Sequence, residues 1–173
     1  MLAVCELRTE MTAFWNDLID RLRHRESEDF TEMQVILHDG GPRKTDRKPE
    51  LVWVRVTGGT DDLFSGIVLE KPAQLRRVRK GSKISFLVQK SGQHALQVSS
   101  RYLEERSSWR LLMPCNQCGL SELLDPPSEL VAGIFPAITS EDLAQGFTFT
   151  TRCGWCGGGL VVRIKRTRWP WTK

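Results

Sequence analysis

The sequence lacks long apolar runs. No stretch of about 18 consecutive apolar residues is present, although a membrane-spanning helix needs one of that length. The first residues, Met1 to Glu6, also lack the basic segment and apolar stretch of a secretory signal peptide. We therefore expect no membrane partner and a cytoplasmic location, where thiols stay reduced.

A marked excess of one charge is also missing. The 25 Lys and Arg residues outnumber the 21 Asp and Glu residues only slightly, and the net charge is +4. Such a balance permits an anionic partner without requiring one. Hydrophobic and charged contents of 40% and 27% are those of a soluble globular protein, which argues against wholesale disorder.

The sequence motifs of the common enzyme classes are absent. There is no phosphate-binding loop, no dinucleotide-binding glycine pattern, no serine-hydrolase elbow and no His-Glu-x-x-His pair. Histidine is scarce, and none of the three belongs to a recognisable catalytic motif in the sequence. These are His24, His38 and His94. The chain is therefore interpreted as non-enzymatic and without an evident small-molecule cofactor.

What is present in the first two thirds predicts an α+β domain. Apolar residues at helical spacing predict an amphipathic helix over residues 10–25, packed on an antiparallel sheet. Short β-rich segments separated by turn residues follow. The expected strands lie at residues 30–37, 51–56 and 63–69, within residues 78–88, and at residues 93–99.

Three of these segments resemble a known family. The first segment, Glu50 to Val56, reads as a strand that contains Trp53-Val54. The second, Phe64 to Pro72, contains Gly66 and Pro72, and the third, Val78 to Phe86, contains Lys80-Gly81. This pattern is similar to the YegJ-like family of uncharacterised bacterial proteins over about residues 10–110. The chain departs from it at Glu70-Lys71 and Ser82, where the family has Asn and Asp. The resemblance implies a compact α+β domain and a bacterial source, but no activity.

Four of the five cysteines form two Cys-x-x-Cys pairs. Cys115 and Cys118 follow a predicted strand, Cys153 and Cys156 follow another, and each pair precedes a glycine. Two intervening residues let both sulfurs of a pair face one ion, and four thiolates suit tetrahedral zinc. We therefore predict one structural zinc ion per chain. The 34 residues between Cys118 and Cys153 leave room for short helices at 120–124, 128–134 and 140–143.

Two other roles for these cysteines fit the pattern less well. A redox dithiol usually has its first cysteine at a helix N-terminus, where the dipole stabilises the thiolate. Cys156 is instead followed by three glycines and a strand-forming Leu160-Val161-Val162 segment. A catalytic zinc needs an open coordination position, which four cysteines do not leave. The pattern favours a structural site.

Basic residues gather in two segments. One contains Lys83 and four other cations, and the other is interleaved with tryptophan and ends at Lys173. Arginine beside tryptophan suits a stacking surface for single strands, a protein-binding hot spot, or a solvated edge. The candidate partner-binding residues are Arg76, Arg77, Arg79, Lys80, Arg163, Lys165, Arg166, Arg168, Trp169 and Trp171.

These observations predict two domains. An α+β domain spans residues 1–108, and a zinc-ribbon-like module with a helical insertion spans residues 109–173. The leading functional interpretation is a non-catalytic zinc-binding bacterial protein that docks on another macromolecule, first of all a protein, in an immunity- or accessory-type role. Two alternatives stay open, a nucleic-acid-binding zinc ribbon and a thiol redox enzyme or hydrolase. The ribbon alternative uses Arg163, Lys165, Arg166 and Trp169.

Overall fold

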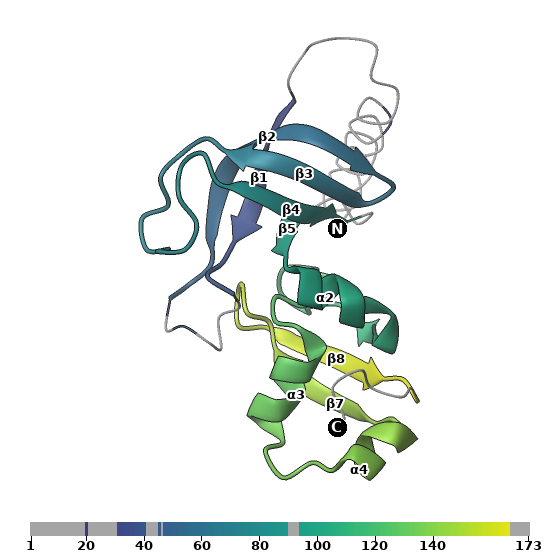
Figure 1. The fold of residues 1–173 in the computed structure, drawn as a ribbon. Coiled ribbons are helices and arrows are strands. Elements are labelled where there is room, and N and C mark those ends of the chain that lie inside the picture. Colours follow the sequence, from purple (N-terminus) through teal and green to yellow (C-terminus); the bar gives the residue numbers. More distant parts are fainter. Residues whose placement is uncertain (1–19, 21–30, 41–44, 46, 90–93, 167–173) are drawn as a thin grey trace, which may run out of the picture. The chain divides into compact units, whose positions relative to one another are not determined.

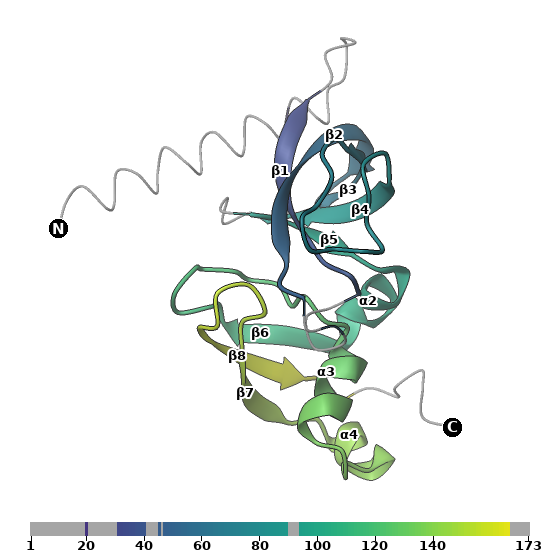
Figure 2. The same ribbon diagram turned by 90° about the vertical axis from the view of Figure 1, so that its left-hand side faces the viewer.

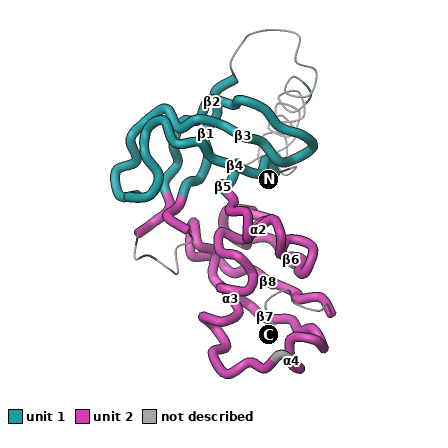
Figure 3. Tube along the Cα trace, viewed as in Figure 1, with its two compact units in different colours: residues 1–37, 50–97 teal, residues 38–49, 98–173 magenta. Residues whose placement is uncertain are grey.

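The computed structural model describes residues 20, 31–40, 45, 47–89 and 94–166. The predicted helix over 10–25, apart from Asp20, lies outside the described residues, as do Arg168, Trp169 and Trp171. The chain divides into two compact units (Figure 3). The first contains residues 1–37 and 50–97, and the second contains residues 38–49 and 98–173. Residues 98–108 thus belong to the second unit, whereas the predicted boundary at 108 assigns them to the first domain.

The first unit is a closed five-stranded barrel rather than the predicted open antiparallel sheet (Figures 1 and 2). Its strands follow one another around the barrel in chain order. A barrel of five up-and-down strands must close with a parallel pair, and β1 and β5 do pair in parallel, with Val35 opposite Ala95. Closure removes the exposed strand edges that an open sheet would have. The strands are β1 (Glu32–Leu37), β2 (Glu50–Thr60), β3 (Leu63–Val68), β4 (Lys83–Val88) and β5 (Ala95–Val98).

Alternation along the strands fills the barrel with apolar side chains. On β2, Val52, Val54 and Val56 are buried, whereas Trp53 is 41% exposed on the outer face. On β4, the alternate residues Ile84, Phe86 and Val88 are buried in the same core. Gly66 on β3 makes room for this packing, because a Cβ there would lie 2.4 Å from Val54 Cγ1. The barrel core comprises Met33, Val35, Leu37, Val52, Val54, Val56, Phe64, Val68, Leu75, Val78, Ile84, Phe86, Val88 and Ala95.

The second unit is built on a three-stranded antiparallel sheet with the order β6-β8-β7. Trp109 pairs with Ile164, and Phe149 pairs with Val162. The strands are β6 (Trp109–Met113), β7 (Thr148–Arg152) and β8 (Gly159–Ile164), and the helices are α2 (Ser100–Glu105), the 3-10 turn η1 (Arg106–Ser108), α3 (Pro127–Ile134) and α4 (Ser140–Gln145). Within the described part of the chain, no helix is long and apolar enough to cross a membrane.

The segment between the two cysteine pairs contains two short helices. The predicted helices at 128–134 and 140–143 are found as α3 and α4. The predicted helix at 120–124 is wrong, because these residues form no helix. The carbonyl oxygen of Leu120 instead accepts a hydrogen bond from the Cys115 N–H group, which ties the start of this segment to the cysteine turn. Leu120, Leu123 and Leu124 are buried, so this irregular segment still contributes to the core.

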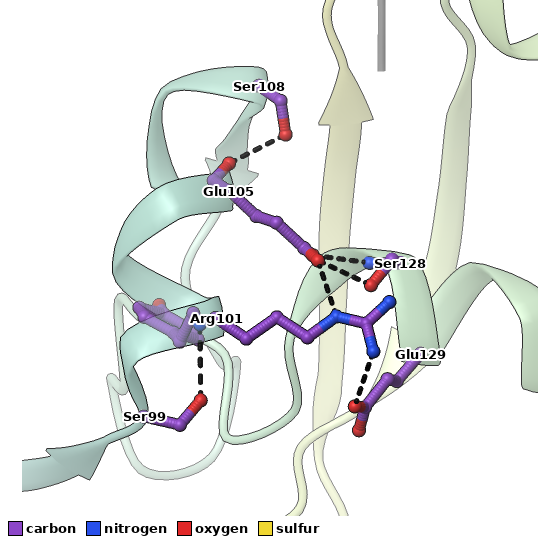
Figure 4. A network of polar contacts seen from close by, with 7 residues as sticks. Ser99, Arg101, Glu105, Ser108, Ser128 and Glu129 are labelled. Atoms are coloured by element: carbon purple, nitrogen blue, oxygen red, sulfur yellow. Dashed lines mark hydrogen bonds and ion pairs between the residues drawn. The ribbon is translucent and has the colours of Figure 1, made fainter. Parts of the chain in front are cut away.

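A buried carboxylate joins α2 to the start of α3 (Figure 4). Glu105 is only 1% exposed, and its carboxylate accepts hydrogen bonds from the Ser128 N–H group at 2.8 Å and the Ser128 hydroxyl at 2.6 Å. Helix α3 begins at Pro127 and its N-cap residue, Pro126, supplies no side-chain cap. Glu105 therefore caps α3 from another helix. Arg101 donates to the same carboxylate at 2.9 Å.

A second buried cluster surrounds Tyr102, which lies on α2 and is 1% exposed. Its hydroxyl donates to the Glu122 carboxylate and accepts from the Leu123 N–H group at 3.3 Å. Arg106 donates to the other oxygen of Glu122 at 2.7 Å. Burial, together with the neighbouring Glu122 charge, raises the pKa of Tyr102 well above its usual range. The tyrosine is thus a neutral donor that fixes the irregular segment after Leu120.

Candidate metal centre

The four predicted ligands lie in two turns that have the same construction. We call residues 115–120, which follow β6, knuckle 1, and residues 153–158, which follow β7, knuckle 2. In each knuckle the first cysteine's N–H group donates to a carbonyl five residues later, Leu120 or Gly158. The first cysteine's carbonyl accepts from Gly119 or Gly157 at 2.9 Å. Both of these glycines have positive φ, +71° and +81°, which residues with a Cβ seldom adopt.

The four sulfur atoms meet at one point between the knuckles. All four lie within 4.8 Å of one another, and all four cysteines are free thiols. The Cys115–Cys156 and Cys118–Cys153 sulfur pairs are 3.3 Å and 3.8 Å apart. A tetrahedron with metal–sulfur bonds of about 2.3 Å has sulfur–sulfur edges of about 3.8 Å. The cluster therefore has the size of a tetrahedral thiolate site.

Backbone N–H groups point at the sulfurs in a repeated pattern. Cys115 accepts from the N–H groups of Gln117 and Cys118, and Cys153 accepts from the corresponding Trp155 and Cys156. The second cysteine of each knuckle accepts from the residue two positions later. These donors are Leu120 for Cys118 and Gly158 for Cys156. Such donors offset the negative charge that four thiolates bring to a divalent ion.

The thiol pKa values differ within the cluster. Burial by itself would raise the pKa of Cys115, but hydrogen bonds from the Cys118 and Gln117 N–H groups and from neighbouring thiols lower it to about 7. Burial raises the pKa of Cys118 and of Cys153. Four thiols this close cannot all ionise without a cation between them, because each thiolate disfavours the next. The arrangement therefore suits a metal ion that replaces the thiol protons.

Two residues whose identity the Cys-x-x-Cys pattern does not specify hold the knuckles together. Asn116 donates its N–H to the Gly159 carbonyl at 3.1 Å and accepts the Gly159 N–H on its side-chain oxygen at 2.9 Å. Gly158 lies so close to knuckle 1 that a Cβ would be 2.7 Å from the Cys115 sulfur. The Cys-x-x-Cys spacing indicates neither role, and the Gly157-Gly158-Gly159 run is the one sequence signal for them.

We expect Gly158→Ala to disturb this site. The added methyl group would overlap the Cys115 sulfur and the Asn116 side-chain oxygen, so the knuckles must move apart. Such overpacking costs about 1–3 kcal/mol and should also weaken metal binding. Thermal unfolding of the metal-loaded protein and competition with a zinc chelator measure the two effects.

Gly133→Ala is the matched control for this prediction. Gly133 lies in α3, and a Cβ there meets nothing within 4 Å. Alanine is favoured over glycine inside a helix by up to about 1 kcal/mol, so this change should leave metal binding alone and slightly raise stability. Equal behaviour of the two variants would contradict the close approach of Gly158 to the ligand.

The basic residues predicted on the last strand are individually tethered. Arg163 lies exposed on β8 and donates to the Thr148 hydroxyl at 3.4 Å, while Lys165 donates to the Ser107 carbonyl at 2.8 Å. Arg166 donates to the Gln145 carbonyl at 2.9 Å. The strand alternation predicts Arg166 on the face of Val162 and Ile164, yet it is exposed because β8 ends at Ile164. The other basic segment belongs to the barrel unit and is considered below.

The fold and site together define a protein with a small closed β-barrel and a second unit whose four clustered cysteines could hold a metal ion. In comparisons with protein-family models, with curated proteins and with solved structures, none matches the chain. The resemblance to the YegJ-like family therefore stays a prediction. What the protein does must be inferred from its own residues.

Proposed function

We propose that this chain is a non-catalytic zinc-binding protein, whose second unit is a zinc-ribbon-like module held by a structural ion. The closed set of four sulfurs within 4.8 Å carries this proposal. Four protein thiolates complete a tetrahedral shell and leave no position for a metal-bound water or substrate. The ligands would be Cys115, Cys118, Cys153 and Cys156.

Zinc is the ion that this donor set suits best. A tetrahedral set of four soft sulfurs selects zinc or iron among the common divalent metals. Zinc has no preferred geometry of its own and no redox chemistry, so it suits a site that only cross-links two turns. Cys115 and Cys153 are 3% exposed, whereas Cys118 is half-buried and Cys156 is exposed, so one side of the site faces solvent.

The ion's role would be to hold a small sheet together. The three strands β6, β7 and β8 are each five or six residues long, and β6 buries only Trp109 fully. Because the ligands come from two turns that follow different strands of this small sheet and a preformed site does not exist in the unfolded chain, the free energy of metal binding adds to the folding free energy. With the ion in a structural role, we place the protein's activity on its surfaces, as a docking protein for another macromolecule.

The metal content of the purified protein tests this proposal. Protein prepared without added zinc is analysed by plasma mass spectrometry, and reactive thiols are counted before and after chelation. We expect one zinc per chain and four thiols that become reactive only when the ion is removed. A coloured protein with one iron per chain would keep the ligand set and change the metal.

A thiol redox function is the second candidate, and one observation favours it. The pKa of Cys115 is lowered to about 7, so part of this thiol is ionised near neutral pH, and the Cys156 sulfur lies 3.3 Å away. Metal-free protein with cysteine pairs that oxidise readily would support this role. That result would overturn the structural zinc site.

A further inference from the structure

The barrel unit carries a strongly basic segment between β3 and β4, which we call the basic loop, residues 69–82. Residues 71–103 contain no Asp or Glu, and Glu70 is the one acidic residue of the loop. Five cations in the loop are exposed, and Lys83 follows at the start of β4. The loop leaves the barrel at the end opposite the β2–β3 hairpin, on the left in Figure 1. The exposed cations are Lys71, Arg76, Arg77, Arg79 and Lys80.

The basic loop is held firmly although it contains no helix or strand. The Glu50 carboxylate accepts hydrogen bonds from three successive N–H groups, those of residues 73–75, at 2.7, 2.5 and 3.1 Å. Leu75 and Val78 are buried in the barrel core. Since these two side chains point inward, the residues between and after them are directed outward. The loop therefore presents its cations in a defined arrangement.

The outer face of β2, β3 and β4 continues from this loop. Ile67 lies between Arg55 and Lys83 in the strand register, and Ser65 lies opposite Ser85. A hollow of about 360 Å³ opens on this face, lined by Lys83, Ile67 and the hydroxyl residues Thr57, Ser65 and Ser85 among others. Hydroxyl groups beside a lysine are common donors to phosphate oxygens.

An exposed tryptophan lies on the same face. Trp53 precedes Arg55 on the outer side of β2 and is 41% exposed. Its carbonyl accepts the N–H of Leu69, the first residue of the basic loop, so Trp53 pairs with the residue at which the loop begins. Aromatic side chains beside a track of cations form a stacking surface for unpaired bases.

We propose that this face of the barrel, from Trp53 through the basic loop to the Lys83 hollow, binds single-stranded nucleic acid. The cations would contact the phosphate backbone, and Trp53 would stack on a base. An acidic protein would also be drawn to the cations but would not need an exposed ring beside hydroxyl donors. This inference rests on the proposed docking role and names its partner.

Fluorescence anisotropy with a labelled oligothymidylate of about 12 nucleotides tests the proposal on the full, zinc-loaded chain. We expect binding that weakens as salt rises from about 50 to about 200 mM. The combined variant Arg76→Gln, Arg79→Gln and Lys80→Gln should bind at least about 10-fold more weakly. It should also lower the slope of log affinity against log salt by about 2, since each single-strand phosphate contact contributes about 0.7.

Variants of Trp53 distinguish binding by base stacking from binding by charge attraction alone. Trp53→Ala should weaken binding about 10-fold without changing the salt slope, whereas Trp53→Phe, which keeps a ring, should retain most of the affinity. Circular dichroism of each variant verifies that the barrel is folded. Equal binding of polyglutamate, with no effect of Trp53→Ala, would overturn the proposal in favour of an acidic protein partner.

The matched charge control lies in the second unit. The combined variant Arg163→Gln, Lys165→Gln and Arg166→Gln removes three positive charges, as many as the loop variant does. Because these residues lie outside the proposed face, the affinity for the oligonucleotide should stay within about 2-fold of wild type and the salt slope should not change. Loss of binding in this variant instead would place the nucleic acid on the ribbon and overturn the assignment to the barrel. No oligonucleotide binding by zinc-loaded protein would overturn this inference alone, because zinc content and thiol protection test the metal site separately.

Discussion

Cys153→Ser is expected to release the zinc ion and unfold the second unit, while the barrel of the first unit stays folded. A serine hydroxyl remains protonated at neutral pH and does not replace a thiolate ligand. Structural zinc sites contribute apparent binding free energies of about 10–16 kcal/mol in small zinc-dependent peptides. Whole domains are stable by only about 5–15 kcal/mol, so loss of even part of this contribution is enough to unfold a small sheet.

Hydrogen exchange measured by mass spectrometry distinguishes the two units in this variant. Amides of β6, β7 and β8 should lose their protection, whereas those of β2 and β3 should keep it, because the barrel has its own core. Cys5→Ser is the control, since Cys5 is not one of the four clustered cysteines, and it should retain one zinc per chain. A Cys153→Ser protein with full zinc content and an unchanged melting curve would show that the site is assigned wrongly.

Glu105→Ala is expected to destabilise the second unit by about 2–4 kcal/mol. The substitution leaves the Ser128 N–H and hydroxyl groups buried without their acceptor and removes the cap of α3. We assign little of the effect to the ion pair with Arg101, because that arginine is 50% exposed and its charge is screened by solvent. Glu105→Gln keeps the shape but weakens both bonds, so it should lie between wild type and alanine.

Urea unfolding of the zinc-loaded protein measures this effect, and the neighbouring Glu104 supplies the control. Glu104 lies on the same helix with an exposed side chain, so Glu104→Ala should change the unfolding free energy by less than about 0.5 kcal/mol. If the two alanine variants unfolded at the same urea concentration, the capping role of Glu105 in Figure 4 would be refuted.

The metal site was predictable because its information is local. Two residues between cysteines and a glycine afterwards are enough to predict each knuckle, since a turn of this length brings both sulfurs to one side. The structure brings all four predicted ligands together. The strands were predictable for a similar reason, because apolar alternation over a few residues directs side chains such as Ile84 and Phe86 into the core. These features depend on neighbours in the chain.

The remaining features depend on residues that are distant in the sequence. The pairing of β1 with β5, which closes the barrel, joins Val35 to Ala95, and no local pattern specifies it. The capping of α3 by Glu105 crosses 23 positions and depends on the burial of its carboxylate, which no local pattern indicates. Glu50 likewise fixes the basic loop from a distant position, 24 residues before Gln74. The sequence by itself thus determined where the strands and knuckles form and which four cysteines cluster. Only the tertiary structure decided which polar groups are buried and which charges share a face, because both depend on contacts between distant segments.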